Sequence, residues 1–412
     1  MCRNSLTEHS MKIFYLNQLY SPHVAGGSEI CLQEEAEGMR ARGHDVVVLA
    51  TGPEPGLSVD QVNGVKVIRA GTNNVYWHYR KEKRSFIAGK TWHIKDSYNA
   101  AMATTVESVL DVEAPDLVAV HTLPGWSAAA WQAIASRNLP IVQVLHDLYH
   151  LCATTQMFRD GGVCEQRCMS CRLLRTRSRR ASNAVSAVIG VSQFVLNKHL
   201  SAGFFDKASV RKVVFNARSL KAEVARREPL QGGSSNVRFG FIGTLSPAKG
   251  IELLLSEFAR KLPGATLSIA GRGDPAYVEA LKRKYESDTV RFLGYAKPGE
   301  FFASIDVLVV PSLWNDTYPG VAVESCIYGV PVIGSARGGI PEIITDKLTG
   351  LIFEPTREGA LLEAMKHFVD FPEQAEKMGA AAQESSRAMV DIQGWLDTYE
   401  NLYTDLLEAR IG

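Results

Sequence analysis

Short apolar runs alternate with longer stretches of mixed polarity along the whole chain. In the first half, the apolar runs are KIFYLN (12–17), DVVVLA (45–50), DLVAVH (116–121), IVQVLH (141–146) and AVIGVS (187–192). Continuous runs rich in β-branched residues, separated by helix-length segments, are typical of buried strands in a parallel sheet with crossover helices. The pattern therefore predicts a doubly wound α/β domain in the first half of the chain.

The alternation stops near Asn216, continues as a charged stretch that ends in QGGSS (231–235), and restarts at VRFGFIG (237–243). Four more apolar runs follow: TLSIAG (266–271), VRFLGY (290–295), DVLVVPS (306–312) and PVIGSA (331–336). A Gly- and Ser-rich stretch between two periodic segments indicates a linker. We predict a first domain over 1–216, a linker over 217–236 and a second domain over 237–390. A C-terminal helix over 391–412 could pack back on the first domain.

Composition agrees with two cores and restricts the partners. The chain has 412 residues, of which 46% are hydrophobic, which is more than one core usually serves. The 45 Lys and Arg residues nearly cancel 44 Asp and Glu residues, so no overall charge favours nucleic acid. No apolar run reaches the roughly 18 residues of a spanning helix, and the polar start is not a signal peptide. We expect a cytoplasmic protein without a nucleic-acid partner.

In each half of the chain, a glycine loop follows the first strand and precedes a helical pattern. The first contains Gly26 and Gly27, and the second, GTLSPAKG (243–250), contains Thr244 and Lys249. Backbone N–H groups at the start of a helix attract phosphate, and a lysine there adds a positive charge. Alternatively, the glycines would only form a tight turn, and Lys249 would be a solvated side chain. The loops are therefore candidate anion sites.

The segment PSLWNDTYPGVAVESC (311–326) follows a predicted strand and contains two acids. Pro319 suits the first position of a helix, which places Glu324 inside that helix and Asp316 in the loop before it. One carboxylate could then face sugar hydroxyls while the other accepts from ribose hydroxyls. Two acids at this spacing alone are more often surface or capping residues.

The order of these features resembles a known family. It comprises the Gly26-Gly27 loop, a histidine ending a strand at 146, the Lys249 loop, the acids at 316 and 324, and GGIPE (338–342). From about Met11 the chain resembles the large family of retaining glycosyltransferases of the GT-B fold, which includes bacterial polysaccharide, lipopolysaccharide and mannoside transferases. The resemblance implies two Rossmann-like domains facing across a cleft. It also implies transfer of a hexose-type sugar from a UDP- or GDP-sugar to a glycan or lipid-linked acceptor, without a required cofactor.

The resemblance also assigns roles around the donor phosphates. In that family, the loop that matches Gly26 and Gly27 faces the phosphates, and the basic residue that matches Lys249 neutralises them. The helix start would offer the N–H groups of Gly320 and Val321 to sugar or phosphate oxygens. We expect the acceptor hydroxyl to attack from the front face while Lys249 and these N–H groups stabilise the departing diphosphate.

Around the sugar, the resemblance assigns three residues and reveals three departures. Glu324 would bind the ribose, Asp316 would lie beside the donor sugar, and His146 would position the reacting sugar without covalent catalysis. By itself His146 could equally be a core histidine. Thr244 stands where the family commonly has arginine, so one charge facing the diphosphate is missing or supplied elsewhere. Asp316 replaces the usual Glu, and Pro319 replaces a common glycine, which removes an N–H donor.

Four of the seven cysteines fall within twenty residues, at 152, 164, 168 and 171. Cys152, Cys164, Cys168 and Cys171 could close a tetrahedral zinc site, with no ligand position left for Lewis-acid chemistry. Some members of the resembled family carry a similar cysteine-rich insertion here. Unligated reduced thiols or a redox pair are the alternatives. We expect a structural zinc that fixes the loop after His146.

Two basic stretches of the first domain are candidates for the acceptor side. YWHYRKEKR (76–84) combines aromatic and cationic residues, and five arginines fall between 172 and 180. Such stretches favour a peripheral membrane contact or a phosphate-bearing acceptor, although solvated helix faces would have the same composition. Two other functions remain: a nucleotide-sugar epimerase of related fold, and a non-catalytic sugar-nucleotide-binding subunit. The departures at Thr244 and Asp316 favour the latter.

Overall fold

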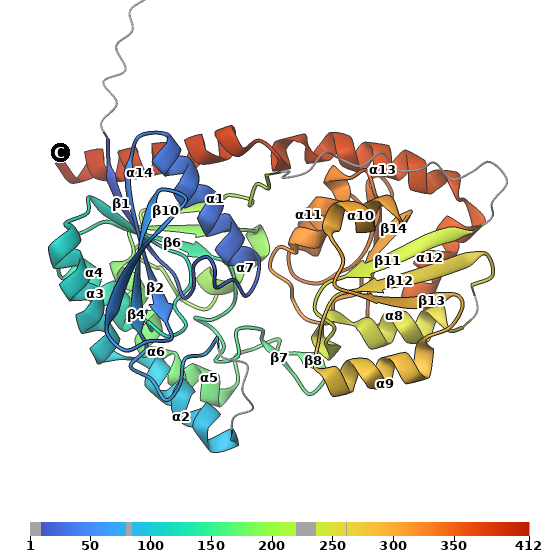
Figure 1. Cartoon of the computed structure of the whole chain (residues 1–412), viewed down its shortest axis with the longest axis horizontal. Helices are drawn as coiled ribbons and strands as arrows, with labels where there is room; N and C mark the ends of the chain where they lie inside the picture. Colours follow the sequence, from blue (N-terminus) through green and yellow to red (C-terminus); the bar gives the residue numbers. More distant parts are fainter. Residues whose placement is uncertain (1–9, 80–84, 220–235, 261, 412) are drawn as a thin grey trace, which may run out of the picture.

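The computed structural model describes residues 10–79, 85–219, 236–260 and 262–411, and it contains two main sheets in two lobes (Figure 1). The first sheet has eight strands in the order β10-β9-β6-β5-β1-β2-β4-β3. The second has six strands in the order β13-β12-β11-β14-β15-β16. The predicted pair of doubly wound α/β domains is therefore confirmed.

The strands of the first sheet are parallel except for β3, which pairs antiparallel with β4. They are β1 (Lys12–Leu16), β2 (Asp45–Gly52), β3 (Leu57–Val62), β4 (Val65–Gly71), β5 (Leu117–Val120), β6 (Ile141–Leu145), β9 (Ala187–Gly190) and β10 (Val210–Val213). The helices are α1 (Gly27–Ala41), α2 (Phe86–Ser97), α3 (Ala100–Glu113), α4 (Ala129–Ala135), α5 (Met169–Leu174), α6 (Thr176–Ala181) and α7 (Gln193–Leu200). Every residue of β5, β6 and β9 is buried, as their continuous apolar runs predict.

The second sheet is parallel throughout. Its strands are β11 (Val237–Ile242), β12 (Ala265–Ala270), β13 (Val290–Gly294), β14 (Val307–Val310), β15 (Val332–Ser335) and β16 (Gly350–Phe353). Its helices are α8 (Ile251–Phe258), α9 (Pro275–Tyr285), α10 (Pro298–Ala303), α11 (Gly320–Ile327), α12 (Ala360–Asp370) and α13 (Glu373–Ser385). Parallel strands place their carboxyl ends, and thus the loops that follow them, at one edge of each sheet.

The end of the chain returns from the second lobe to the first. After α13, helix α14 (Ile392–Ile411) runs along the first lobe and packs against α1 (Figure 1). Glu400 of α14 accepts from the Arg42 guanidinium at 2.5 Å and contacts His44 Nε2 at 2.9 Å. Tyr403 of α14 is fully buried in the core of the first domain. Most of the predicted linker, 217–236, lies outside the described residues.

Direct hydrogen bonds join the facing edges of the two domains. The Thr317 hydroxyl of the second domain donates to the His146 carbonyl oxygen at 2.6 Å. Glu342, from the GGIPE segment, accepts from the backbone N–H groups of Gln193 and Phe194 at 2.6 and 2.7 Å. These two N–H groups open α7, so the Glu342 carboxylate lies at the positive end of a helix of the other domain. These hydrogen bonds therefore connect the two domains directly.

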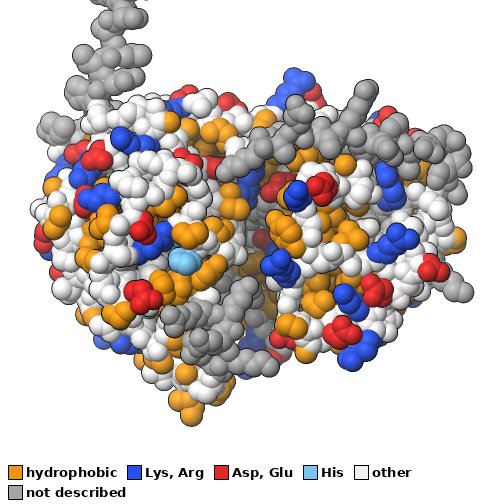
Figure 2. Space-filling model, in the orientation of Figure 1, with side chains coloured by type: hydrophobic (Ala, Val, Ile, Leu, Met, Phe, Trp, Pro, Cys, Tyr) orange, Lys and Arg blue, Asp and Glu red, His pale blue; other side chains and the backbone are white. Residues whose placement is uncertain are grey.

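A short hairpin of β7 (Phe158–Arg159) and β8 (Gly162–Val163) lies in the insertion between β6 and α5. Beyond it, helices α2 and α5 contact each other at the lower end of the first lobe (Figure 1). Apolar side chains are exposed at this end of the surface (Figure 2). Among the described residues, none of the helices combines the length and apolar character needed to cross a bilayer.

Candidate functional site

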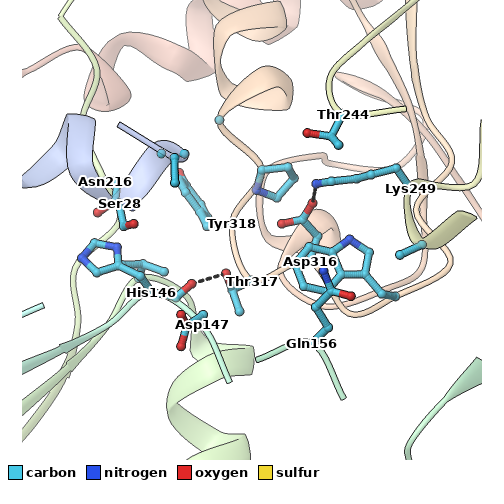
Figure 3. A pocket seen from close by; sticks show the side chains of 18 of the residues that line it. Ser28, His146, Asp147, Gln156, Asn216, Thr244, Lys249, Asp316, Thr317 and Tyr318 are labelled. Carbon is cyan, nitrogen blue, oxygen red and sulfur yellow. Dashed lines mark hydrogen bonds and ion pairs between the residues drawn. The ribbon is translucent and has the colours of Figure 1, made fainter. Parts of the chain in front are cut away.

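A cavity of about 370 Å³ lies between the two domains, and both domains contribute to its wall (Figure 3). This volume falls within the range of small-molecule sites, about 300–1,000 Å³. The first domain and the segment after it contribute Ala25, Gly26, Gly27, Ser28, His146, Asp147, Gln156, Val191, Asn216 and Arg218. The second domain contributes Thr244, Ser246, Ala248, Lys249, Trp314, Asp316, Thr317, Tyr318, Pro319 and Gly320. The wall thus includes the loops that follow β1, β6, β11 and β14.

Two helices begin at the cavity, one from each domain. Gly26 is the N-cap of α1, and Pro319 is the N-cap of α11, so the free N–H groups of both first turns lie near the cavity wall. Gly26 donates its N–H to the Glu29 carboxylate at 2.9 Å, which satisfies one of the four free donors of α1. The partial positive charges of two helix starts make this part of the cavity suited to an anion.

Arg218 lies between these two helix starts. A Cβ atom placed on Gly27 would lie 3.0 Å from Arg218 Nη2, and a Cβ placed on Gly320 would lie 2.5 Å from the same nitrogen. The guanidinium thus occupies space that any larger side chain at Gly320 would fill. Within the described part of the chain, the Arg218 side chain makes no hydrogen bond or ion pair. Three sources of positive potential therefore meet at this part of the cavity.

On the opposite wall, Lys249 is paired with Asp316. The Lys249 ammonium lies 2.5 Å from Asp316 Oδ2 and 5.1 Å from the centre of the Trp314 ring (Figure 3). An ammonium group has three donors, so this ion pair leaves two for a ligand. Asp316 is buried, and its loop is held from behind by a turn in which Gly338 has a φ of +61°. A Cβ on Gly338 would lie 2.0 Å from the Asp316 carbonyl oxygen, so glycine is required there.

His146 follows β6 and is held by a second histidine. Its Nε2 lies 3.0 Å from His121 Nδ1, and the two rings stack with centroids 5.1 Å apart. Burial, and secondarily the positive charge of Arg218, lowers the pKa of His146 to about 3. His146 is therefore neutral at physiological pH. A neutral imidazole can position a hydroxyl group by a hydrogen bond, but it supplies no positive charge.

Most of the residues predicted from the sequence meet at this cavity. Its wall includes seven of them: Gly26, Gly27, His146, Thr244, Lys249, Asp316 and Gly320. Val321 and Glu324 lie further along α11 and are not part of the wall. Burial raises the pKa of the Glu324 carboxyl, whereas the charge of Arg218 lowers it. The roles assigned to all these residues stay predictions.

Sequence reasoning missed Arg218, Ser28, Asp147, Gln156 and Asn216, which also line the cavity. Arg218 and Asn216 belong to no motif, because they reach the cavity only through the packing of the two domains. Asp147 directly follows His146, and burial raises the pKa of its carboxyl to about 6. Its position beside the predicted histidine is the one signal in the sequence that could have identified it.

The four clustered cysteines are close enough to affect one another's ionisation: burial, and then the charges of Cys152 and Cys168, raise the pKa of the Cys164 thiol. The sulfur atoms of Cys152 and Cys171 are 3.9 Å apart, whereas Cys168 is exposed and its sulfur contacts the Ser170 hydroxyl. Within the residues that the structure describes, no group of three His, Cys, Asp or Glu side chains is arranged to hold a metal ion. The structural zinc therefore stays a prediction that only metal analysis tests.

Two family descriptions match the chain, one in each domain. Residues 25–213 match the family described as Glycosyltransferase Family 4, and residues 227–385 match the family described as Glycosyl transferases group 1. A similar sequence is an uncharacterized 42.6 kDa protein in the cps region of Klebsiella pneumoniae. It is 28% identical over 333 residues, which cover 81% of this chain and 87% of that protein.

Solved structures with the same architecture match nearly the whole chain. Sucrose-phosphate synthase from Thermosynechococcus elongatus superposes with a TM-score of 0.76 at 20% identity, covering 97% of this chain and all of that one. HepE of Anabaena, solved in complex with UDP and glucose, gives a TM-score of 0.71 at 19% identity, covering 96% of this chain and 100% of HepE. At these identities the likeness establishes the fold, in which the cavity lies between two Rossmann-like domains.

Proposed function

Because the chain belongs to the glycosyltransferases of the GT-B fold, we propose that it moves a hexose-type sugar from a nucleoside-diphosphate sugar to an acceptor hydroxyl, with retention of configuration at the anomeric carbon. One observation supports this proposal above the others. Cationic side chains and two helix starts converge on the interdomain cavity, where a diphosphate would neutralise them. UDP-hexoses are the first donors to test, since HepE was solved with UDP and glucose.

The diphosphate would lie between Arg218 and Lys249. Arg218 supplies the charge that Thr244 lacks, because its guanidinium reaches the same cavity from the segment after the first domain. Planar guanidinium groups match the geometry of phosphate oxygens, and each charge-assisted hydrogen bond is about twice as strong as a neutral one. The departure at Thr244 thus does not leave the leaving group without a second cation.

The reaction would follow from these positions. The acceptor oxygen attacks the anomeric carbon from the face on which the diphosphate leaves, and the bond between that carbon and the phosphate oxygen breaks. Its electron pair goes to the phosphate oxygen, which also receives the acceptor proton. Lys249 and Arg218 stabilise the developing negative charge. Neutral His146 positions a sugar hydroxyl, and Asp316, held by Lys249, faces the sugar.

A panel of sugar nucleotides tests this function and separates it from its rivals. The protein is incubated with each donor, with and without glycan acceptors, while free nucleoside diphosphate and the identity of the sugar are measured. Transfer releases nucleoside diphosphate and forms a glycoside. An epimerase would convert the sugar without releasing nucleotide. A non-catalytic subunit would bind the donor, which would raise the melting temperature of the protein, but it would neither release nucleotide nor change the sugar. Either of the last two results would overturn the proposal.

For the acceptor side, we propose peripheral contact with a membrane that carries a lipid-linked acceptor. Five apolar side chains are 64–81% exposed at the contact of α2 with α5 and are called here the apolar tip; they are Phe86, Ile87, Ile94, Met169 and Leu173. Exposed cations flank it, including Lys90, whose ammonium lies 4.2 Å from the Phe86 ring centre, and Arg172. Apolar residues with cations beside them suit the interface of an anionic bilayer.

Sedimentation with lipid vesicles tests the membrane contact. The protein should sediment with vesicles that contain anionic lipid and much less with purely zwitterionic vesicles. Replacing both Phe86 and Ile87 by Ser should abolish this sedimentation. The matched control is Val112→Ser, because Val112 is 80% exposed on α3, outside the apolar tip. Equal binding of all three proteins to anionic vesicles would contradict the contact, and polysaccharide acceptors in solution would then be the alternative.

A further inference from the structure

A chain of polar groups runs from His146 into the interior of the first domain. His146 Nε2 lies 3.0 Å from His121 Nδ1, and His121 Nε2 lies 3.5 Å from Glu35 Oε2. The other carboxylate oxygen of Glu35, Oε1, accepts from the hydroxyl groups of Tyr15 at 3.1 Å and Tyr403 at 2.5 Å. The five elements involved are strand β1, the loops after β5 and β6, helix α1 and helix α14.

The arrangement leaves Glu35 and His121 facing each other. Glu35 is fully buried, and His121 is 3% exposed. Within the described residues, Glu35 Oε2 and His121 Nε2 have no other hydrogen-bond partner. Because both tyrosine hydroxyls donate to Oε1, Oε2 is the oxygen that remains for His121. A buried polar pair of this kind is stabilised only when a proton lies between its two atoms.

The position of that proton fixes the direction of the whole chain. When Glu35 is ionised, His121 Nε2 must carry the proton, so His121 Nδ1 accepts and His146 Nε2 donates. A neutral His146 that donates from Nε2 has an unprotonated Nδ1. When Glu35 is protonated, Oε2 donates to His121 Nε2. His121 Nδ1 then carries the proton and donates to His146 Nε2. His146 Nδ1 then carries the proton.

We propose that Glu35 is a positioning residue which, through His121, sets whether Nδ1 of His146 accepts or donates a hydrogen bond in the interdomain cavity. His146 lines that cavity, and its ring lies beside Ser28 (Figure 3). Within the described part of the chain, Nδ1 makes no hydrogen bond. It is thus the ring atom left for a ligand. The consequence for catalysis rests on the proposed function, but the direction of the chain does not.

The switch falls near neutral pH. Burial raises the pKa of the Glu35 carboxyl to about 7, although the hydroxyl groups of Tyr403 and Tyr15 lower it. Burial also lowers the pKa of both histidines, so neither takes up the proton. The titratable groups that face Glu35 are Tyr15 of β1, Cys31 of α1, His121, and Tyr399 and Tyr403 of α14. Above a pH of about 7, Nδ1 of His146 is therefore an acceptor, and below it a donor.

The variant Glu35→Gln tests this directly. With its carbonyl oxygen held by the two tyrosine hydroxyls, the glutamine presents its NH₂ group to His121, as protonated Glu35 would present its proton. Nitrogen-15 NMR of the ligand-free protein reports the tautomer of His146. In the wild type, the proton should move from Nδ1 to Nε2 as the pH rises from about 6 to 8.5. In Glu35→Gln, it should stay on Nδ1 at every pH.

Glu37→Gln is the matched control, because Glu37 lies on the same helix and bonds Gln33 and Asn63 outside this chain of groups. It should keep the wild-type tautomer change. The same tautomer of His146 in the wild type at pH 8.5 and in folded Glu35→Gln would overturn the proposal. Tyr403→Phe removes a donor to the ionised Glu35 carboxylate, so it should raise the midpoint pH of the tautomer change by about one unit. A midpoint that does not rise in this variant would also overturn the proposal.

The pH dependence of enzyme activity provides a second test of the proposal. An acceptor at Nδ1 suits a sugar hydroxyl near a carbon that gains positive charge, so kcat should rise with pH through about 7 in the wild type. In Glu35→Gln, kcat should stay low and flat while KM for the donor changes little. An unchanged pH profile in Glu35→Gln would contradict this role. If no donor is turned over at all, the proposed function fails, but the NMR result still decides the tautomer.

Discussion

Removing the Arg218 guanidinium should weaken donor binding without destabilising the protein. Arg218 Nη2 lies at the starts of α1 and α11. It is 3.0 Å from the position that a Cβ atom would take at Gly27 and 2.5 Å from the corresponding position at Gly320. A diphosphate bound there would receive one or two charge-assisted hydrogen bonds, each contributing about 1.5–3 kcal/mol. Arg218→Ala should therefore raise the Kd of a nucleoside diphosphate by a factor of about 10 to 150 or more, since 1.4 kcal/mol is tenfold.

Calorimetric titration of UDP into wild type and Arg218→Ala measures this change. Arg218→Lys should restore part of the affinity, because it returns a charge but not the planar fork. Arg211→Ala is the matched control, since Arg211 is an exposed arginine of β10 whose removal changes the net charge equally. The effect of salt on the affinity should also be smaller in Arg218→Ala than in the control.

The ligand-free variant should have nearly the same stability as the wild type. The two helix starts repel the guanidinium by roughly 0.3–1 kcal/mol each, and its attraction for the Glu324 carboxylate, whose pKa it lowers, offsets this repulsion. Thermal unfolding without nucleotide should therefore show no loss, which separates lost binding from lost structure. Equal UDP affinity in wild type and Arg218→Ala would refute the placement of the diphosphate between the two helix starts.

Three further predictions concern the other candidate residues. Lys249→Ala should lower kcat by about 100-fold in a folded protein, because the charge is needed most as the diphosphate leaves; wild-type turnover would contradict this. Glu324→Gln should weaken donor binding by about 1.5–3 kcal/mol, and an unchanged affinity would rule out the ribose assignment. Protein purified without chelators should contain about one zinc per chain, lost when Cys168 and Cys171 become Ser; metal-free wild type with full activity would rule out the zinc site.

The sheets were predictable from the sequence because buried parallel strands have a simple pattern. The runs at 116–121, 141–146 and 187–192 contain β5, β6 and β9 in full, and all of these strands are buried. The hairpin of β3 and β4 was not predicted. β3 is exposed over nearly its whole length, and it contains no continuous apolar run of the kind that reveals a buried strand. Its place at the sheet edge depends on pairing with β4.

The candidate site was predictable only where glycine, histidine, threonine, lysine and acidic residues lie in the loops and helix starts that follow strands. Arg218 could not be found, because its position depends on how two separate domains meet. Glu35 belongs to the run QEEAE (33–37), which would be expected to face solvent. In the structure it is fully buried, since α14 covers that face and brings Tyr403 to its carboxylate from 368 residues away. Contacts at such separation leave no local pattern in a single sequence.

The most direct test of retaining transfer combines product analysis with the cavity variants. Wild-type protein is supplied with a UDP-hexose and a glycan or lipid-linked acceptor, and proton NMR follows the anomeric proton of the product while UDP release is measured. The account predicts one UDP released per glycoside formed, the donor's anomeric configuration in the product, and strongly reduced rates in Lys249→Ala and Arg218→Ala. An inverted product, or full rates in both variants, would contradict it.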